Sequence, residues 1–143
     1  MKEIEKYRKI VEDINEALEG AGRALGHRVW QAIEFYILNY PLVLKETTRN
    51  NGEMTEKLVK NMRIAFEDQI VQKIMPKLRG IEVRGSDKKV LDKIKNILEE
   101  NDFNNLIDDF DFAMEHGYGQ FIWNSAKYIT KEELEENVKN EVI

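Results

Sequence analysis

The 143-residue chain contains no cysteine, which excludes disulfide bonds and thiolate metal sites. It has no apolar run long enough to span a membrane. Its N-terminus carries charges every few residues instead of the apolar core of a signal peptide. These absences favour a soluble, cytoplasmic protein that has no membrane partner.

The glycine-rich loops that commonly bind nucleotides are also missing. The stretch EGAGRALGHRVW, residues 19–30, holds three glycines, but a dinucleotide fingerprint counted from Gly20 needs a glycine where Leu25 stands. A run of glycine, four residues and Gly-Lys-Ser/Thr does not occur either. The chain therefore cannot bind a nucleotide by these devices alone.

The overall charge points to no particular partner. Hydrophobic residues make up 42% of the chain and charged residues 34%, as in a well solvated globular protein. A net charge of -5 argues against broad electrostatic binding to nucleic acid or to an anionic membrane. A local basic patch remains compatible with this charge.

Apolar residues recur at helical spacing along almost the whole chain, which predicts an all-α bundle of about five to six helices. The expected N-caps of the last three helices are Ser86, either Asn101 or Asp102, and Thr130. The periodicity breaks near residues 119–123, where a very short strand packed by Phe121 and Trp123 is expected. We expect one helical domain over residues 1–123 and a C-terminal helical extension over residues 124–143.

Only two prolines are present, and both mark expected helix ends. Pro41 should end a helix that begins at about His27, because proline disfavours helical geometry in the residue before it. Pro76 should distort or end the last turn of a long helix that begins at about Thr55. Residues 42–54 are polar and contain the turn signal Asn51-Gly52, so we expect a loop there.

An acidic cluster near the end of the fifth expected helix admits two interpretations. Its carboxylates share a helical face at spacings of three and four residues, as a metal site on one helix would require. Apolar residues occupy the opposite side, so the simplest interpretation is a solvated helix face, and we predict no metal site. The cluster consists of Asp108, Asp109, Asp111 and Glu115, with His116 nearby.

Basic and aromatic side chains form two further groups. Basic residues around the end of the third expected helix either complement the negative end of the helix dipole or face a phosphate, and both interpretations remain open. Aromatic residues at helical spacing are interpreted as core rather than as a stacking platform. The basic group is Lys73, Lys77, Arg79 and Arg84, and the aromatic group is Trp30, Phe35, Tyr36 and Tyr40.

Arg28 is the strongest candidate site residue. It lies in the expected first turn of a helix, after a glycine segment in which the small Gly26 allows another surface to approach closely. Helix N-termini favour anions, and a guanidinium adds a planar pair of donors that matches phosphate oxygens. The alternative is an exposed arginine paired with Glu34 or another carboxylate.

Three segments carry a family resemblance, and in order they span roughly residues 8–123. The first segment, IVEDINEALEGAGRALGHRVWQAIEFYI, is similar to one family's sequence of a helix, a glycine turn and a following helix. The second, QKIMPKLRG, resembles that family's pattern QKILPKLHG. The third, MEHGYGQFIW, resembles its closing segment HGFTSFW. On these residues the chain resembles the C-terminal helical lid of AAA+ ATPases, in the branch related to McrB, the GTP-driven motor of a modified-cytosine restriction system.

The resemblance implies a role for Arg28 as the sensor-2 arginine, which reaches nucleotide phosphates held by a preceding α/β domain. Gly26 would then lie beside the cofactor, ATP or GTP with Mg²⁺, and the glycines would act as a swivel. The implied partners are that α/β domain, further copies in a ring, a McrC-like nuclease subunit and, indirectly, DNA. Walker A, Walker B and sensor 1 are missing from the sequence, and His27 replaces an aromatic residue found in many relatives.

Two functions are therefore expected from the sequence. In the first, the chain is the lid of such an NTP-hydrolysing motor and has no activity by itself. In the second, it is a free-standing helical adaptor that binds a protein and no nucleotide.

Overall fold

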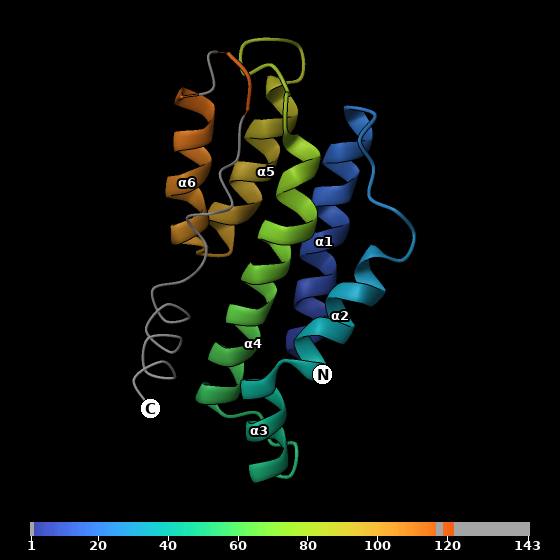
Figure 1. Cartoon of the computed structure of the whole chain (residues 1–143), viewed down its shortest axis with the longest axis vertical. Helices are drawn as coiled ribbons and strands as arrows, with labels where there is room; N and C mark the ends of the chain where they lie inside the picture. The colour runs from blue at the N-terminus through green and yellow to red at the C-terminus, as the bar shows by residue number, and fades with distance from the viewer. Residues whose placement is uncertain (1, 117–118, 122–143) are drawn as a thin grey trace, which may run out of the picture.

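The computed structural model describes residues 2–116 and 119–121. Within this part the chain is all-helical, which confirms the predicted fold class (Figure 1). The α-helices are α1 (Lys2–Gly20), α2 (Val29–Asn39), α3 (Pro41–Arg49), α4 (Glu56–Gln69), α5 (Lys88–Glu100) and α6 (Asn104–Glu115). A π-helical turn, η1 (Ile70–Ile74), and a 3-10 turn, η2 (Met75–Leu78), continue α4.

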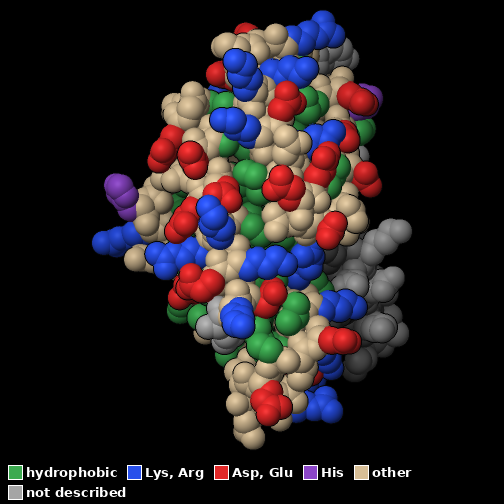
Figure 2. Space-filling view, turned by 180° about the vertical axis from the view of Figure 1, so that it is seen from behind, with side chains coloured by type: hydrophobic (Ala, Val, Ile, Leu, Met, Phe, Trp, Pro, Cys, Tyr) green, Lys and Arg blue, Asp and Glu red, His purple; other side chains and the backbone are tan. Residues whose placement is uncertain are grey.

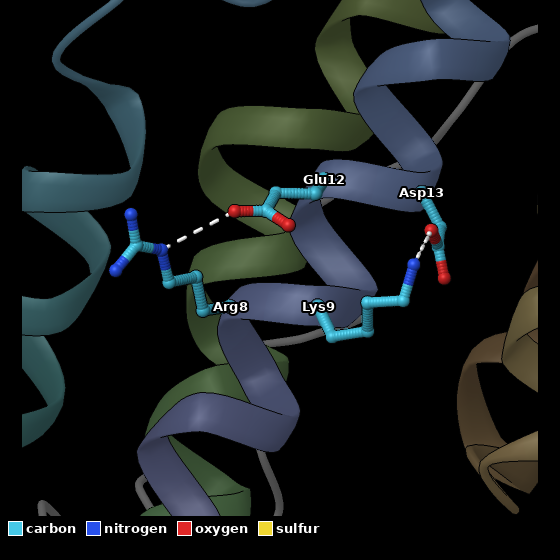
Figure 3. Close-up of polar contacts among 4 residues, drawn as sticks. All are labelled: Arg8, Lys9, Glu12 and Asp13. Atoms are coloured by element: carbon cyan, nitrogen blue, oxygen red, sulfur yellow. Dashed lines mark hydrogen bonds and ion pairs between the residues drawn. The ribbon is translucent and has the colours of Figure 1, made fainter.

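The helices form a bundle around one apolar core. α1 packs against α5 and α2, α4 packs against α2 and α3, and α5 packs against α6. The apolar stripe of α1 is buried throughout, at Ile4, Tyr7, Val11, Ile14 and Leu18. Its opposite face carries two exposed ion pairs, Arg8 with Glu12 and Lys9 with Asp13, and each pair joins residues one helical turn apart (Figure 3). None of the described helices combines the length and apolar character that a membrane crossing requires.

The expectation of a loop after Pro41 is wrong, because residues 41–49 form α3. Proline is well suited to the first position of a helix, where its missing N–H has no partner to lose. The sequence appears polar, yet Val43 is buried and Glu46 is held by Lys57 of α4 at 3.1 Å. The turn at Asn51-Gly52 is confirmed, since both residues have positive φ angles, 52° and 80°.

The expected distortion near Pro76 is confirmed, and it begins earlier than predicted. The α-helix ends at Gln69, widens into the π-helical turn and then tightens into the 3-10 turn that contains Pro76. A proline lacks the N–H for a regular helical bond, and its ring clashes with the carbonyl four residues earlier, here that of Gln72. The wider turn relieves that conflict while Ile74, Met75 and Leu78 stay buried.

Two expected N-caps are wrong. Asp87, not Ser86, is the N-cap residue of α5, and Phe103 is that of α6. Neither makes a side-chain capping bond. Asp102 instead has a positive φ of 59° in the turn between the helices. Capping preferences are weak compared with the packing of a buried residue such as Phe103, which is 1% exposed.

The chain returns to the bundle after α6. The amide of Phe121 donates to the carbonyl of Ile81 at 2.8 Å, and Glu82 and Gln120 form an isolated antiparallel bridge. Phe121 is fully buried against Phe110, with ring centroids 4.8 Å apart. This pairing is shorter than the strand expected near residues 119–123. Trp123 and the expected helix after Thr130 lie outside the described residues.

Candidate functional site: Arg28 and the glycine segment

Arg28 is the N-cap residue of α2, one position before the helix and not inside its first turn as expected. Its side chain is exposed and makes no capping bond. Its backbone carbonyl accepts the first helical hydrogen bond, from the amide of Ala32 at 3.0 Å. Among the described residues its guanidinium has no ion pair, so the alternative pairing with Glu34 is not observed.

The segment before Arg28 is fixed to the bundle along most of its length. Arg23 donates through Nη1 to the carbonyls of Arg79 at 2.7 Å and Lys77 at 3.1 Å. The amide of Leu25 donates to Oδ1 of Asn15 at 2.7 Å, and the Leu25 side chain is buried. Gly22 adopts the left-handed region, with φ of +68°, and thereby lets the chain leave α1. The swivel expected over all three glycines could therefore act only at the residues after Leu25.

Gly26 borders open space. A Cβ atom built at this position would meet only Cγ2 of Val29, at 4.0 Å, which is ordinary van der Waals contact. Its φ angle lies outside the left-handed region. Nothing within the described chain therefore requires glycine at position 26, in contrast to Gly22.

The chemistry available at Arg28 is anion binding. A cation that carries five N–H donors stands at the N-terminus of an 11-residue helix, where the backbone amides and the macrodipole also favour negative charge. The neighbouring His27 is exposed as well. This arrangement can hold a phosphate or carboxylate presented by another molecule, and it brings no nucleophile into contact with Arg28.

The acidic cluster on α6 forms a solvated face, as the amphipathic interpretation predicts. Phe110, on the opposite side of the helix, is buried, whereas Asp108 and Glu115 are exposed. Asp111 pairs with Lys95 of α5 at 2.6 Å, and this carboxylate raises the pKa of Lys95. Across the described residues, no three acidic or histidine side chains are arranged to hold a metal ion.

Comparison with known families places almost the whole chain in one group. The sequence profile of a domain of unknown function, DUF8727, matches residues 1–140. The chain belongs to the DUF8727 family. No curated protein and no solved structure matches it. The DUF8727 match includes most of the expected extension after residue 123, so the division into two parts remains a prediction.

The DUF8727 chain also has an apolar groove that sequence reasoning missed. Eight of the eleven residues of α2 are apolar, which is typical of a helix buried on all sides. Only Ile33 and Ile37 of α2 are buried, and Phe35, expected in the core, is 69% exposed. The groove measures about 340 Å³ and is lined by Phe35, Tyr36, Tyr40, Pro41, Gln69 and Lys73, among others. The composition of α2 could have indicated this groove, because the helix has more apolar side chains than its neighbours α1, α3 and α4 cover.

The basic residues of the DUF8727 chain after Gln72 do not converge on Arg28 in any described contact. Lys73 lines the groove beside α2, whereas Lys77, Arg79 and Arg84 are exposed on η2 and the connection to α5. Glu67 and Asp68, which lie near the end of α4, are only partly exposed. Burial raises the pKa of Glu67, and Asp68 accepts a hydrogen bond from the Tyr36 hydroxyl at 3.3 Å.

Proposed function

We propose that the chain is the helical lid of an AAA+ NTPase of the McrB-like branch and that it delivers Arg28 to the nucleotide phosphates. The observation that carries this proposal is the position of Arg28, an exposed arginine at the start of α2 that forms no ion pair with any described residue. Other arginines make contacts within the bundle, namely Arg8, Arg23, Arg49 and Arg63. A guanidinium left free at a helix N-terminus is suited to an anion that comes from elsewhere.

The conformation of the glycine segment supports the same proposal. Arg23 and Leu25 hold its first half against η2 and α1. The second half, from Gly26 to Arg28, has open space beside Gly26. A short pivot next to a fixed anchor would let α2 carry one charge towards a bound nucleotide or away from it. The ATP or GTP, with its Mg²⁺, would be held by the α/β domain of a parent chain in a cytoplasmic ring.

The test is made on the parent motor. Arg28→Ala should slow NTP hydrolysis by about two to three orders of magnitude, because a donor in direct contact with the reacting phosphate typically contributes that much. Arg28→Lys should restore only part of the rate, since an ammonium lacks the two-pronged geometry. The control is Arg8→Ala, which removes an exposed arginine from an i,i+4 pair on α1 (Figure 3). Unchanged hydrolysis in Arg28→Ala would exclude Arg28 from the mechanism.

The protein-binding adaptor is the second candidate, and the groove at Phe35 favours it. Exposed apolar surface of this kind marks contact sites for other proteins. The reading frame upstream of Met1 separates the two proposals, because the lid requires a preceding Walker A sequence and the adaptor does not. In an adaptor, Phe35→Ser would abolish partner binding and Arg28→Ala would not.

A further inference from the structure

One end of the bundle carries basic side chains that form no ion pair with any described residue. We define the basic end as residues 77–89, which connect α4, through η2, to α5. This stretch contains five basic and two acidic residues, a net charge of +3, whereas the remainder of the chain carries -8. Figure 1 places this connection at the end of the bundle opposite α3, and Figure 2 shows Lys and Arg side chains over that end from behind.

All five cations of the basic end are exposed, and none forms an ion pair with a described residue. Elsewhere in the bundle most of the paired cations have a carboxylate one helical turn away, as Arg8 and Lys9 do. Arg23 adds a sixth positive charge here, because its guanidinium bonds to the carbonyls of Lys77 and Arg79. The cations of the basic end are Lys77, Arg79, Arg84, Lys88 and Lys89.

The start of α5 increases the positive potential of the basic end. Lys88 and Lys89 occupy the first turn of this helix, where no acidic residue is present and the side chain of the N-cap Asp87 makes no capping hydrogen bond. Positive side chains at a helix N-terminus oppose the macrodipole and are mildly unfavourable for the helix itself. Bound anions would remove that repulsion. Stability of the bundle therefore does not explain why two lysines stand there.

We propose that the basic end binds the phosphate backbone of duplex nucleic acid. This inference does not depend on the proposed lid function or on Arg28. A regular array of phosphates is bound by cations alone, without a specific pocket, through the release of condensed counterions. Residues 77–89 contain no aromatic side chain, so they offer no platform on which single-stranded bases would stack.

Other polyanions fit the basic end less well. Anionic membranes are usually bound by a basic face combined with apolar side chains that insert. The exposed large hydrophobic residues among the described positions all lie outside the basic end, at Phe35, Leu42, Leu44, Met54 and Phe112. A protein interface normally needs buried aromatic or apolar anchors as well, and the basic end provides none.

The negative charge of the whole chain does not prevent this contact. α5 has 13 residues, so at a rise of about 1.5 Å per residue its far end lies about 20 Å from the basic end. That distance is about two Debye lengths at 0.1 M salt, and repulsion from acidic residues there is largely screened. The local charge of the basic end therefore decides the interaction at moderate ionic strength.

The experiment measures fluorescence anisotropy of a labelled 20-base-pair DNA duplex titrated with the full chain. If about four phosphates are contacted, log K should fall with log salt at a slope of about -3.6, so a fourfold rise in salt weakens binding about 150-fold. Arg79→Gln/Arg84→Gln/Lys88→Gln should abolish binding. The matched control, Lys6→Gln/Lys45→Gln/Lys60→Gln, removes the same charge from exposed positions elsewhere and should bind like the parent.

Three outcomes would overturn the proposal. The first is no change in anisotropy at 50 mM salt and protein concentrations of about 100 µM, the weak limit of non-specific binding. The second is an equal loss in both triple variants, which would make overall charge responsible. The third is binding of poly-glutamate or of phosphatidylserine vesicles but not of duplex DNA, which would assign the basic end to an acidic protein or a membrane. None of these outcomes bears on hydrolysis by the parent motor, so the two proposals fail independently.

Discussion

Tyr7 offers a sharp test of the core, because its side chain is fully buried and its hydroxyl has no partner in hydrogen-bond geometry among the described residues. The ring packs on Phe66, with centroids 4.4 Å apart. Burial, and next the carboxylate of Glu3, raise the pKa of the Tyr7 phenol, so the hydroxyl stays protonated. Oε2 of Glu3 is likewise buried and has no hydrogen-bond partner among the described residues. Glu3 is therefore close enough to raise the pKa of Tyr7, but the phenol and the carboxylate do not meet in hydrogen-bond geometry.

Removing the Tyr7 hydroxyl should therefore stabilise the chain. An unsatisfied buried polar group costs about 1–3 kcal/mol, and Tyr7→Phe removes that cost while leaving the ring in place. We expect a gain of about 1 kcal/mol, at the lower end of that range because Glu3 loses a polar neighbour. For a chain of this length, 1 kcal/mol corresponds to about 3 °C in Tm.

Tyr36→Phe is the matched control, since it makes the same chemical change where the hydroxyl donates to Asp68 at 3.3 Å. It should cost about 1 kcal/mol, because a bond to a charged acceptor is lost. Thermal and urea unfolding of both variants would measure opposite shifts, about 6 °C apart in Tm. If Tyr7→Phe is instead destabilised as much as Tyr36→Phe, the hydroxyl of Tyr7 has a partner, with Glu3 the candidate, and the reasoning is refuted.

Further predictions concern two carboxylates and the anchor of the glycine segment. Lys57 of α4 lowers the pKa of Glu46, so the ionised carboxylate stabilises the fold above the usual pKa of 4.5 and this stabilisation is lost as pH falls. Glu46→Gln should therefore reduce the loss of stability between pH 7 and pH 3, measured by urea unfolding. Burial raises the pKa of Glu67, so the stability that its protonated form contributes is present below pH 4.5 and is lost as pH rises. At pH 7, Glu67→Gln should unfold at a higher urea concentration than the parent. Equal stability at pH 7 would contradict the raised pKa. Arg23→Ala removes two hydrogen bonds and should speed hydrogen exchange at the amide of Leu25, whereas Arg8→Ala should not.

The fold could be predicted wherever helical periodicity coincides with burial. In α1 and α5 the spacing of apolar residues alone identifies the buried face, because each helix has one apolar stripe and one charged side. α3 could not be predicted in this way. Val43 is its only buried apolar residue, and its stability depends on an ion pair between Glu46 and Lys57 that joins positions eleven residues apart.

The candidate site could be predicted in part. The glycines and Arg28 identify a helix N-terminus from sequence, but Arg23 looks like one more surface charge until η2 is in place. Its acceptors are carbonyls of Lys77 and Arg79, which become available because the 3-10 turn ends there. Contacts to backbone atoms leave no trace in residue type, so the anchored half of the glycine segment required the structure.

Exposed side chains that the fold does not need suggest where the protein contacts other molecules. Arg23, Arg63 and Lys57 have internal partners, and folding explains each of them. Among the described residues, none is an ion-pair partner of Arg28 or of the cations of the basic end, and the ring of Phe35 is exposed; these side chains lie on different elements. An exposed guanidinium or aromatic ring adds nothing to the stability of the bundle. An uncharged polar residue at each of these positions would keep the chain at least as soluble. The three surfaces correspond to the three contacts proposed above: an anion at Arg28 in the lid, an apolar partner at α2 in the adaptor, and a polyanion at the basic end.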